Sequence, residues 1–154
     1  MRLSYRGKMM FVAIAMSISG FAYAHSGAEG VVKERMDMMG EIARAMKTIG
    51  KMVKGEIAYD AKVAKASALE IFGHMSHMTE MFPEGSTEKP SEALPAIWED
   101  WDEFVAISDK LKVDAKQLAE IAEAASSPDA IKAQFGVVGK SCGSCHEKFR
   151  LKQQ

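Results

Sequence analysis

Hydrophobic residues recur at steps of three and four along four segments of the chain, which is the period of one face of an α-helix. No segment shows the strict apolar–polar alternation that predicts a strand. The first helix is predicted to run from about Val32 to just before Gly55, a residue suited to the turn after a helix. Its predicted buried stripe is Val32, Met36, Met39, Ala43, Met46, Ile49 and Val53.

The second helix is predicted to begin after Asp60, because aspartate caps helix N-termini, and to end at Phe82, because Pro83 cannot continue a helix. Residues 83–94 then form the one long loop. The predicted stripe of the second helix is Ala61, Ala64, Ala68, Ile71, Met75, Met78 and Phe82.

The third helix is predicted to begin at Pro95, and the fourth at Ser127-Pro128-Asp129, with the serine as its cap and the proline in its first turn. The third stripe is Ile97, Trp101, Phe104, Ser108, Leu111, Ala115, Leu118, Ala122 and Ala125. The fourth is Ile131, Phe135, Val138, Cys142, Cys145 and Phe149. Four amphipathic helices with short connections predict an all-α, antiparallel (up-down-up-down) four-helix bundle.

The first 24 of the 154 residues are predicted to lie outside this bundle. Arg2, Arg6 and Lys8 precede a mostly apolar stretch, and Ala22-Tyr23-Ala24 fits the small-x-small rule of signal peptidase sites. We expect a secretory signal peptide at 1–24, cleaved after Ala24, and a bundle domain at 25–154. The alternative is a membrane anchor, but the apolar run is short for a span and lacks a stop-transfer flank.

The charge of the mature chain is mildly acidic. The chain has 20 Lys and Arg residues, and removal of the three in the signal leaves 17 against 21 Asp and Glu, a net charge of −4. This balance argues against nucleic acid and against an anionic membrane as partners.

The chemistry-bearing motif is Cys142-Gly143-Ser144-Cys145-His146, which holds the only two cysteines of the chain. Two cysteines three apart, followed by histidine, predict covalent attachment of a c-type haem. On a helix both cysteines lie on one face and can reach one edge of a porphyrin, while His146 can bind the iron. Both cysteines fall on the fourth apolar stripe, so the haem should lie inside the bundle.

Other uses of a Cys-x-x-Cys pair fit less well. A thioredoxin-like redox pair needs a preceding strand, and no strand is predicted there. A zinc site needs about four ligands, which this chain supplies poorly. A disulfide between residues three apart would close too small a loop to stabilise the fold much.

Several local sequences together resemble the class II cytochromes c, the cytochrome c′ family, including its low-spin, Met-ligated branch. They are Val32-Lys33-Glu34-Arg35, Lys54-Gly55 with Tyr59-Asp60, Phe82-Pro83-Glu84-Gly85-Ser86, Pro95-Ala96-Ile97-Trp98 and Val137-Val138-Gly139-Lys140-Ser141-Cys142. The resemblance spans the mature chain, and cytochrome c′ is itself a known example of the four-helix bundle. It implies one haem c, held by thioethers to Cys142 and Cys145, with His146 as the proximal iron ligand.

The resemblance also implies roles for other side chains. Arg35 would lie near a haem propionate, Met36 would contact the haem, and Trp98 would pack close to the porphyrin. Arg150 would lie beside the proximal histidine, and Met39 falls at the distal position. The alternatives are a solvated helix charge for Arg35, a core residue for Trp98 and a core methionine for Met39.

Met39 decides between two functions. If its sulfur binds the iron, the haem is low-spin and suits electron transfer. If it only packs over the haem face, the iron is five-coordinate and binds nitric oxide or carbon monoxide. Arg35 is more usual in the five-coordinate branch, so the two signals conflict. The leading prediction is a periplasmic monohaem cytochrome that transfers one electron to redox partner proteins and is not an enzyme; the alternative is a gas-binding haem protein.

Two further segments carry polar side chains of interest. Residues 74–81 hold two histidines and three methionines, which could bind a soft metal such as copper. The favoured interpretation buries Met75 and Met78 and leaves His74, His77 and Met81 near the surface. The acidic residues that flank Trp101 are predicted to be solvated.

A homodimer through the first two helices is a further expectation from the resemblance. Met38 and Met52, which fall off the predicted stripe of the first helix, would be exposed and would suit such a surface.

Overall fold

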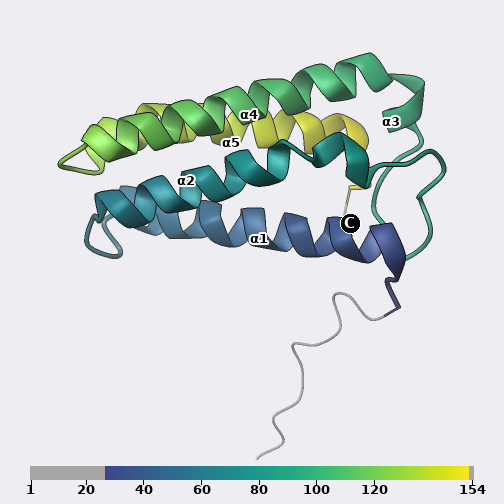
Figure 1. The fold of residues 1–154 in the computed structure, drawn as a ribbon, viewed down its shortest axis with the longest axis horizontal. Helices are drawn as coiled ribbons and strands as arrows, with labels where there is room; N and C mark the ends of the chain where they lie inside the picture. Colours follow the sequence, from purple (N-terminus) through teal and green to yellow (C-terminus); the bar gives the residue numbers. More distant parts are fainter. Residues whose placement is uncertain (1–26, 153–154) are drawn as a thin grey trace, which may run out of the picture.

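The computed structural model describes residues 27–152, which form an all-helical bundle (Figure 1). The long helices are α1 (Gly30–Val53), α2 (Ala61–Met75), α4 (Trp101–Ala124) and α5 (Asp129–Phe149), with a 3-10 turn η1 (Met78–Met81) and a short α3 (Ala96–Glu99). In Figure 1, α1 lies beside α2 and α4 lies beside α5. Within residues 27–152 there is no strand, apart from an isolated antiparallel bridge between Ala93 and Arg150. The predicted four-helix bundle is confirmed.

The stripes predicted for the last three long segments form the core. The largest fully buried side chains are Phe104, Ile49, Ile71, Ile97, Leu118, Ile131 and Val138. Three phenylalanines meet edge to face, with ring centroids 4.8 Å apart for Phe82 and Phe104 and 5.5 Å apart for Phe104 and Phe149. Such pairs stabilise a core beyond the area that they bury.

The stripe predicted for α1 is wrong by one position over much of its length. The buried residues of this helix are Val32, Arg35, Met38, Ile42, Ala45, Ile49, Gly50 and Met52. The predicted Met36, Met39 and Met46 are only partly buried. The reason is that α1 carries two adjacent apolar faces: one packs into the core, and the other lines the cavity described below.

The exposed methionines expected on a dimer surface are also wrong. Met38 is 7% exposed and Met52 is 2% exposed, because both belong to the core face of α1. The large exposed apolar side chains of α2 are Val63 and Leu69, so an interface on this side of the bundle would have to use residues such as these.

The second and third helices end and begin differently from the prediction. α2 ends at Met75, because the amide of Ser76 donates to the carbonyls of both Phe72 and Gly73 and tightens the last turn. η1 then keeps Met78 and Phe82 buried, so the apolar period continues across the break. The predicted third helix is interrupted at Asp100, whose backbone (φ −121°, ψ 46°) leaves the helical region between α3 and α4.

Two predicted helix caps have different outcomes. Asp60 does cap α2, since its Oδ1 accepts hydrogen bonds from the amides of Lys62 at 2.9 Å and Val63 at 3.1 Å. Ser127 makes no capping hydrogen bond to α5. Pro128, with φ −66°, already has the helical backbone conformation and starts this helix without a side-chain cap.

The predicted signal peptide and its cleavage site lie outside the described residues. Between residues 27 and 152, no helix combines the length and the apolar character that crossing a membrane requires.

Candidate functional site

A cavity of about 740 Å³ lies between α1 and α5 and is lined mainly by apolar side chains. α1 contributes Met36, Met39 and Met46 to one wall, and α5 contributes Cys142, Cys145 and His146 to the other. Further lining residues come from η1, from α4 and from the long loop, among them Met78, Phe82, Phe104, Ile107, Leu111, Ser91 and Ala93. The cavity therefore gathers the cysteine–histidine motif and the predicted distal methionine around one space.

The two cysteines are free, partly buried thiols on the cavity wall. Burial raises the pKa of both thiols, and the neighbouring Cys142 adds to the effect at Cys145, where the pKa reaches about 11. Reactive redox thiols have a pKa below the ordinary value. The raised pKa values therefore argue against a thioredoxin-like redox pair.

His146 lies at the edge of the cavity and also lines a second, outer pocket of about 400 Å³ with Gly143, Glu147 and Arg150. Desolvation of its ring and the nearby positive charge of Arg150 lower the pKa of His146, while Glu92 acts in the opposite direction. Both leading effects favour the neutral imidazole, which is the form that binds a metal.

Two glycines let the cavity reach the backbone of both walls. A Cβ atom added at Gly139 of α5 would meet no other atom within 4 Å, and one at Gly40 of α1 would meet only Nη1 of Arg44, at 3.5 Å. The volume falls within the range of ligand pockets, about 300–1,000 Å³. An apolar space of this size, with two thiols and an imidazole on one wall, fits a haem attached through Cys142 and Cys145.

Beyond the inner end of the cavity, α1 and α5 come into contact. A Cβ at Gly50 of α1 would lie 3.4 Å from Cζ of Phe135 of α5. From this contact the two helices enclose the cavity, whose outer end is lined by Arg35 of α1 and Arg150 beyond α5. The two helices therefore touch at one end and enclose the cavity at the other. We call this arrangement of α1 and α5 the wedge.

Arg35 lies on the cavity wall and is 4% exposed, so the alternative of a solvated helix charge is wrong. Its Nη1 donates to the carbonyl of Met81 at 3.1 Å and to Oγ of Ser86 at 3.0 Å. Its Nη2 donates to the carbonyl of Ser86 at 2.8 Å and to Oγ of Ser91 at 2.7 Å. The guanidinium also lies 4.5 Å from the ring centroid of Phe82. Arg35 thus holds the long loop against α1.

The same loop, residues 83–94, is fastened to the end of α5, and we call it the strap. The amide of Leu94 donates to the carbonyl of Phe149 at 3.0 Å, and the amide of Leu151 donates to the carbonyl of Glu92 at 2.8 Å. These bonds flank the bridge between Ala93 and Arg150. The strap therefore connects the α1 wall of the cavity to the α5 wall.

Of the side chains singled out in the sequence, the cavity gathers Arg35, Met36, Met39, Cys142, Cys145, His146 and Arg150. Trp98 is not among its lining residues. The indole Nε1 of Trp98 donates to the carbonyl of Phe82 at 3.1 Å, so this side chain supports a lining residue from behind.

The sequence reasoning missed the strap residues Ser86, Ser91 and Glu92. No hydrophobic period marks them, and the local resemblance that ends at Ser86 assigned it no role, because their contacts depend on residues far away in the chain.

The segment at the end of α2 follows the favoured interpretation. Met75 and Met78 are buried and line the cavity. His74 Nε2 lies 3.1 Å from a carboxylate oxygen of Glu41, and His77 Nδ1 lies 3.3 Å from one of Glu80. Among residues 27–152, no group of three or more His, Cys, Asp and Glu side chains comes together as a metal site.

Fold and site together define a monohaem c-type protein of the four-helix-bundle class. The sequence model described as Cytochrome C′ matches residues 30–150. The chain belongs to the cytochrome c′ family, whose members carry haem c, as the resemblance implied.

Individual relatives agree with this assignment. A cytochrome c-556 of Agrobacterium tumefaciens (strain II Chrys) is 35% identical over 124 residues, which cover 80% of this chain and 99% of the relative. The solved cytochrome c′ of Rhodopseudomonas palustris superposes with a TM-score of 0.76 at 30% identity, covering 82% of this chain and 100% of the other. The nitric oxide complex of a mutant cytochrome c prime from Alcaligenes xylosoxidans gives a TM-score of 0.70 at 29% identity, covering 79% and 94%.

Proposed function

We propose that this protein is an exported monohaem cytochrome that transfers single electrons between redox partner proteins and catalyses no reaction of its own. When bound, haem c supplies the one-electron ferrous/ferric couple. The observation that carries the proposal is the thioether of Met39, on the cavity wall opposite the helix that bears both cysteines and His146. Histidine and methionine together are the axial ligands of electron-transferring c-type haems.

Six of the lining residues have separate parts in this proposal. Cys142 and Cys145 would hold the haem through thioethers, and His146 and Met39 would be the iron ligands. Met36 would contact the haem face, and the guanidinium of Arg35 would offset the charge of a propionate. The apolar walls would keep water away from the iron. Little solvent would then have to reorient when the iron changes its oxidation state.

Arg150 and Trp98 would act beside these residues. Arg150 lines the cavity next to His146 and would restrict solvent at the proximal side. Trp98 would act through Phe82, whose carbonyl it binds, rather than by touching the haem.

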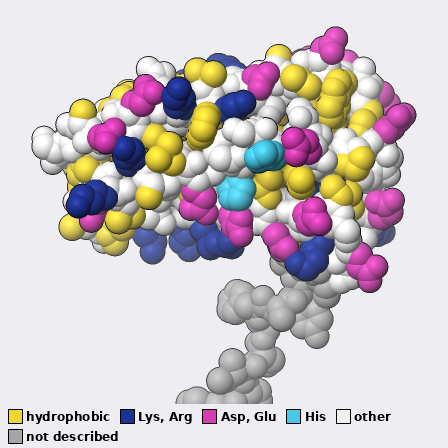
Figure 2. Space-filling view, viewed as in Figure 1, with side chains coloured by type: hydrophobic (Ala, Val, Ile, Leu, Met, Phe, Trp, Pro, Cys, Tyr) yellow, Lys and Arg dark blue, Asp and Glu magenta, His cyan; other side chains and the backbone are white. Residues whose placement is uncertain are grey.

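The exposed edge at His146 would be where electrons enter and leave. Figure 2 shows that acidic side chains gather around the end of the bundle that carries α3 and the strap. With a mature net charge of −4, by the subtraction given above, this surface would favour a basic redox partner. The signal sequence at residues 1–24 would direct the protein to the periplasm.

The second candidate is a five-coordinate haem protein that binds nitric oxide or carbon monoxide. Two observations favour it: the cavity reaches the backbone at Gly40 and Gly139, and a mutant of the similar protein from Alcaligenes xylosoxidans has been solved as a nitric oxide complex. In this case Met39 would pack over the distal face without binding the iron.

Absorption spectra of the ferric and ferrous protein, before and after carbon monoxide, separate the two candidates. Electron transfer predicts a low-spin spectrum with a sulfur-to-iron charge-transfer band that carbon monoxide leaves unchanged. Met39→Leu should abolish that band and open the iron to carbon monoxide. Met46→Leu is the control, because Met46 lines the same cavity two helical turns further along α1.

A high-spin spectrum that shifts on adding carbon monoxide would reject electron transfer through a Met-ligated iron and support gas binding. If the parent is low-spin but Met39→Leu keeps its spectrum, Met39 is not the ligand.

A further inference from the structure

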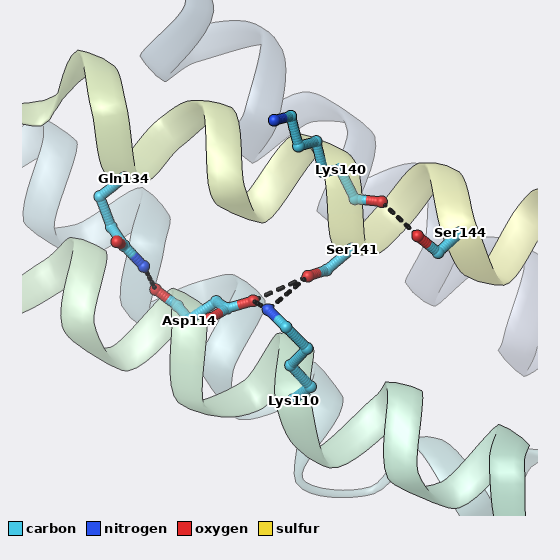
Figure 3. Close-up of polar contacts among 6 residues, drawn as sticks. All are labelled: Lys110, Asp114, Gln134, Lys140, Ser141 and Ser144. Carbon is cyan, nitrogen blue, oxygen red and sulfur yellow. Dashed lines mark hydrogen bonds and ion pairs between the residues drawn. The ribbon is translucent and has the colours of Figure 1, made fainter.

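A polar cluster joins α4 to α5 (Figure 3), and its Ser141 directly precedes the cysteine motif. We call Lys110, Asp114, Gln134 and Ser141 the Asp114 cluster. Asp114, Gln134 and Ser141 are buried in an otherwise apolar helix contact. Nothing in the proposed electron transfer uses them, so the cluster needs an explanation of its own.

Three of its side chains form a closed triangle. Ser141 Oγ donates to Asp114 Oδ2 at 2.7 Å, and Lys110 Nζ donates to the same oxygen at 2.5 Å and to Ser141 Oγ at 3.2 Å. The ammonium of Lys110 compensates the charge of a carboxylate that the helix contact has removed from water. The hydroxyl of Ser141 is therefore held in one direction, toward α4.

Gln134 adds a second attachment point to the same residue of α4. Its Nε2 donates to the backbone carbonyl of Asp114 at 3.0 Å. Gln134 and Ser141 are seven residues apart, so they lie on the same face of α5, about two turns from each other. Two hydrogen bonds separated along the axis and directed to a single residue fix both the rotation and the axial position of α5.

Other polar contacts of α5 hold its last turn: Lys148 pairs with Asp100 and Glu103, and the strap binds the chain at Phe149 and Arg150. Before the cysteine motif, little else could fix the register of α5. Added Cβ atoms at Gly136, Gly139 and Gly143 would meet no other atom within 4 Å, so these positions contact nothing on the outer and cavity sides. Ile131, Val138 and Phe149 are buried, but apolar contacts have no preferred direction and tolerate small shifts. Buried polar groups are best known for fixing register in helical assemblies.

We propose that the Asp114 cluster is a positioning device that sets the rotation and height of α5, and so places His146 and both cysteines toward the cavity. Ser141 directly precedes Cys142, and each residue of an α-helix turns the chain by about 100°. A small rotation of α5 at Ser141 would therefore also turn Cys142, which follows it directly, and His146, about one helical turn after Cys142. Asp114 and Ser141 act through the backbone of α5 rather than by hydrogen bonds to either thiol.

The test uses the haem-bearing protein with Ser141→Ala, which cuts the link to α5 but leaves the Lys110–Asp114 ion pair on α4. Ser144→Ala is the matched control, because the Ser144 hydroxyl donates within α5, to the carbonyl of Lys140 at 2.9 Å (Figure 3). Ser141→Thr restores a hydroxyl. Since alanine is the better helix former, a change in Ser141→Ala cannot come from lost helix propensity.

Two measurements report on α5 whether the protein carries electrons or binds gas. We expect ferric electron paramagnetic resonance signals to shift in Ser141→Ala but not in Ser144→Ala, because the proximal imidazole changes its orientation. We expect amide hydrogen exchange over residues 138–149 to accelerate about tenfold, which corresponds to the loss of one hydrogen bond to a charged group. Ser141→Thr should recover most of both effects, and adding Gln134→Met should enlarge them.

The proposal is overturned if Ser141→Ala and Ser144→Ala give the same resonance signals. It is equally overturned if Ser141→Ala lowers the melting temperature while those signals stay as in the parent, since the cluster would then stabilise the bundle without positioning the haem ligands.

Discussion

Arg150 reaches Glu92 with two of its nitrogens, Nε and Nη2, each 2.6 Å from the same carboxylate oxygen Oε2. The pair fastens the end of α5 to the strap, beside the histidine that the motif assigns to iron. Because both side chains are partly exposed, its contribution to global stability should be small.

Glu92→Gln should loosen this junction locally. We expect faster hydrogen exchange at the amides of Leu94 and Leu151, which bridge the strap and the chain end, while the free energy of unfolding falls by less than about 1 kcal/mol. Glu123→Gln is the control, because it removes an ion pair with Lys65 that joins α2 to α4. Equal exchange in both variants would mean that the backbone bonds hold the junction without the ion pair.

Arg35→Met should destabilise the protein by about 3 kcal/mol in urea unfolding. The carbonyls of Met81 and Ser86, and the hydroxyls of Ser86 and Ser91, would lose a donor at a largely buried site. Arg35→Lys should cost less but remain destabilising, because an ammonium cannot reproduce the fork of a guanidinium.

Arg44→Met on the same helix is the control for Arg35, since the Arg44 side chain is 70% exposed. Its effect should stay within about 0.5 kcal/mol of the parent. If the two methionine variants lose equal stability, the strap does not depend on Arg35.

Cys145→Ala should leave the haem attached through one thioether to Cys142. We expect a shifted haem band in alkaline pyridine, and a lower melting temperature because the haem fills the bundle interior. The mass of the intact protein gives the fraction that carries haem, and Ser144→Ala should match the parent. A haem band in alkaline pyridine at the same position as in the parent would contradict the attachment assignment.

Gly136→Ala should stabilise the protein by about 0.5–1 kcal/mol in thermal unfolding. Glycine weakens a helix interior, and the added Cβ would meet no other atom within 4 Å. Gly139→Phe should have the opposite result, because its ring would enter the cavity and reduce the fraction of protein that carries haem. Stabilisation by both changes would mean that the space at Gly139 is not part of the haem site.

The sequence predicted most of the helical architecture because α2, α4 and α5 each bury one apolar stripe. It misplaced the stripe of α1, where Met38 and Ile42 face the core while Met36 and Met39 line the cavity. The hydrophobic pattern cannot distinguish these faces, since a wall that covers a cofactor is as apolar as a wall that covers another helix. The breaks at Ser76 and Asp100 were missed because the apolar period continues across both.

For the candidate site too, the sequence could predict some of the residues and not others. Cys142, Cys145 and His146 could be predicted as haem-binding residues because haem attachment imposes a spacing of this kind within about one helical turn. The strap contacts could not, because Arg35 and Ser86 are 51 positions apart and meet only when the chain has folded. The burial of Arg35 therefore had to come from the structure.

The wedge formed by α1 and α5 would let two properties change separately: the rate at which small molecules enter the cavity, and the equilibrium chemistry of the iron. Gly50 and Phe135 set the spacing of these helices from outside the cavity, so a bulkier residue at position 50 would spread them around the haem site. Such a change would alter how fast small molecules enter, without replacing any side chain that lines the cavity. Evolution or design could therefore adjust the kinetics of access at Gly50 and leave the equilibrium chemistry of the iron to its own ligands.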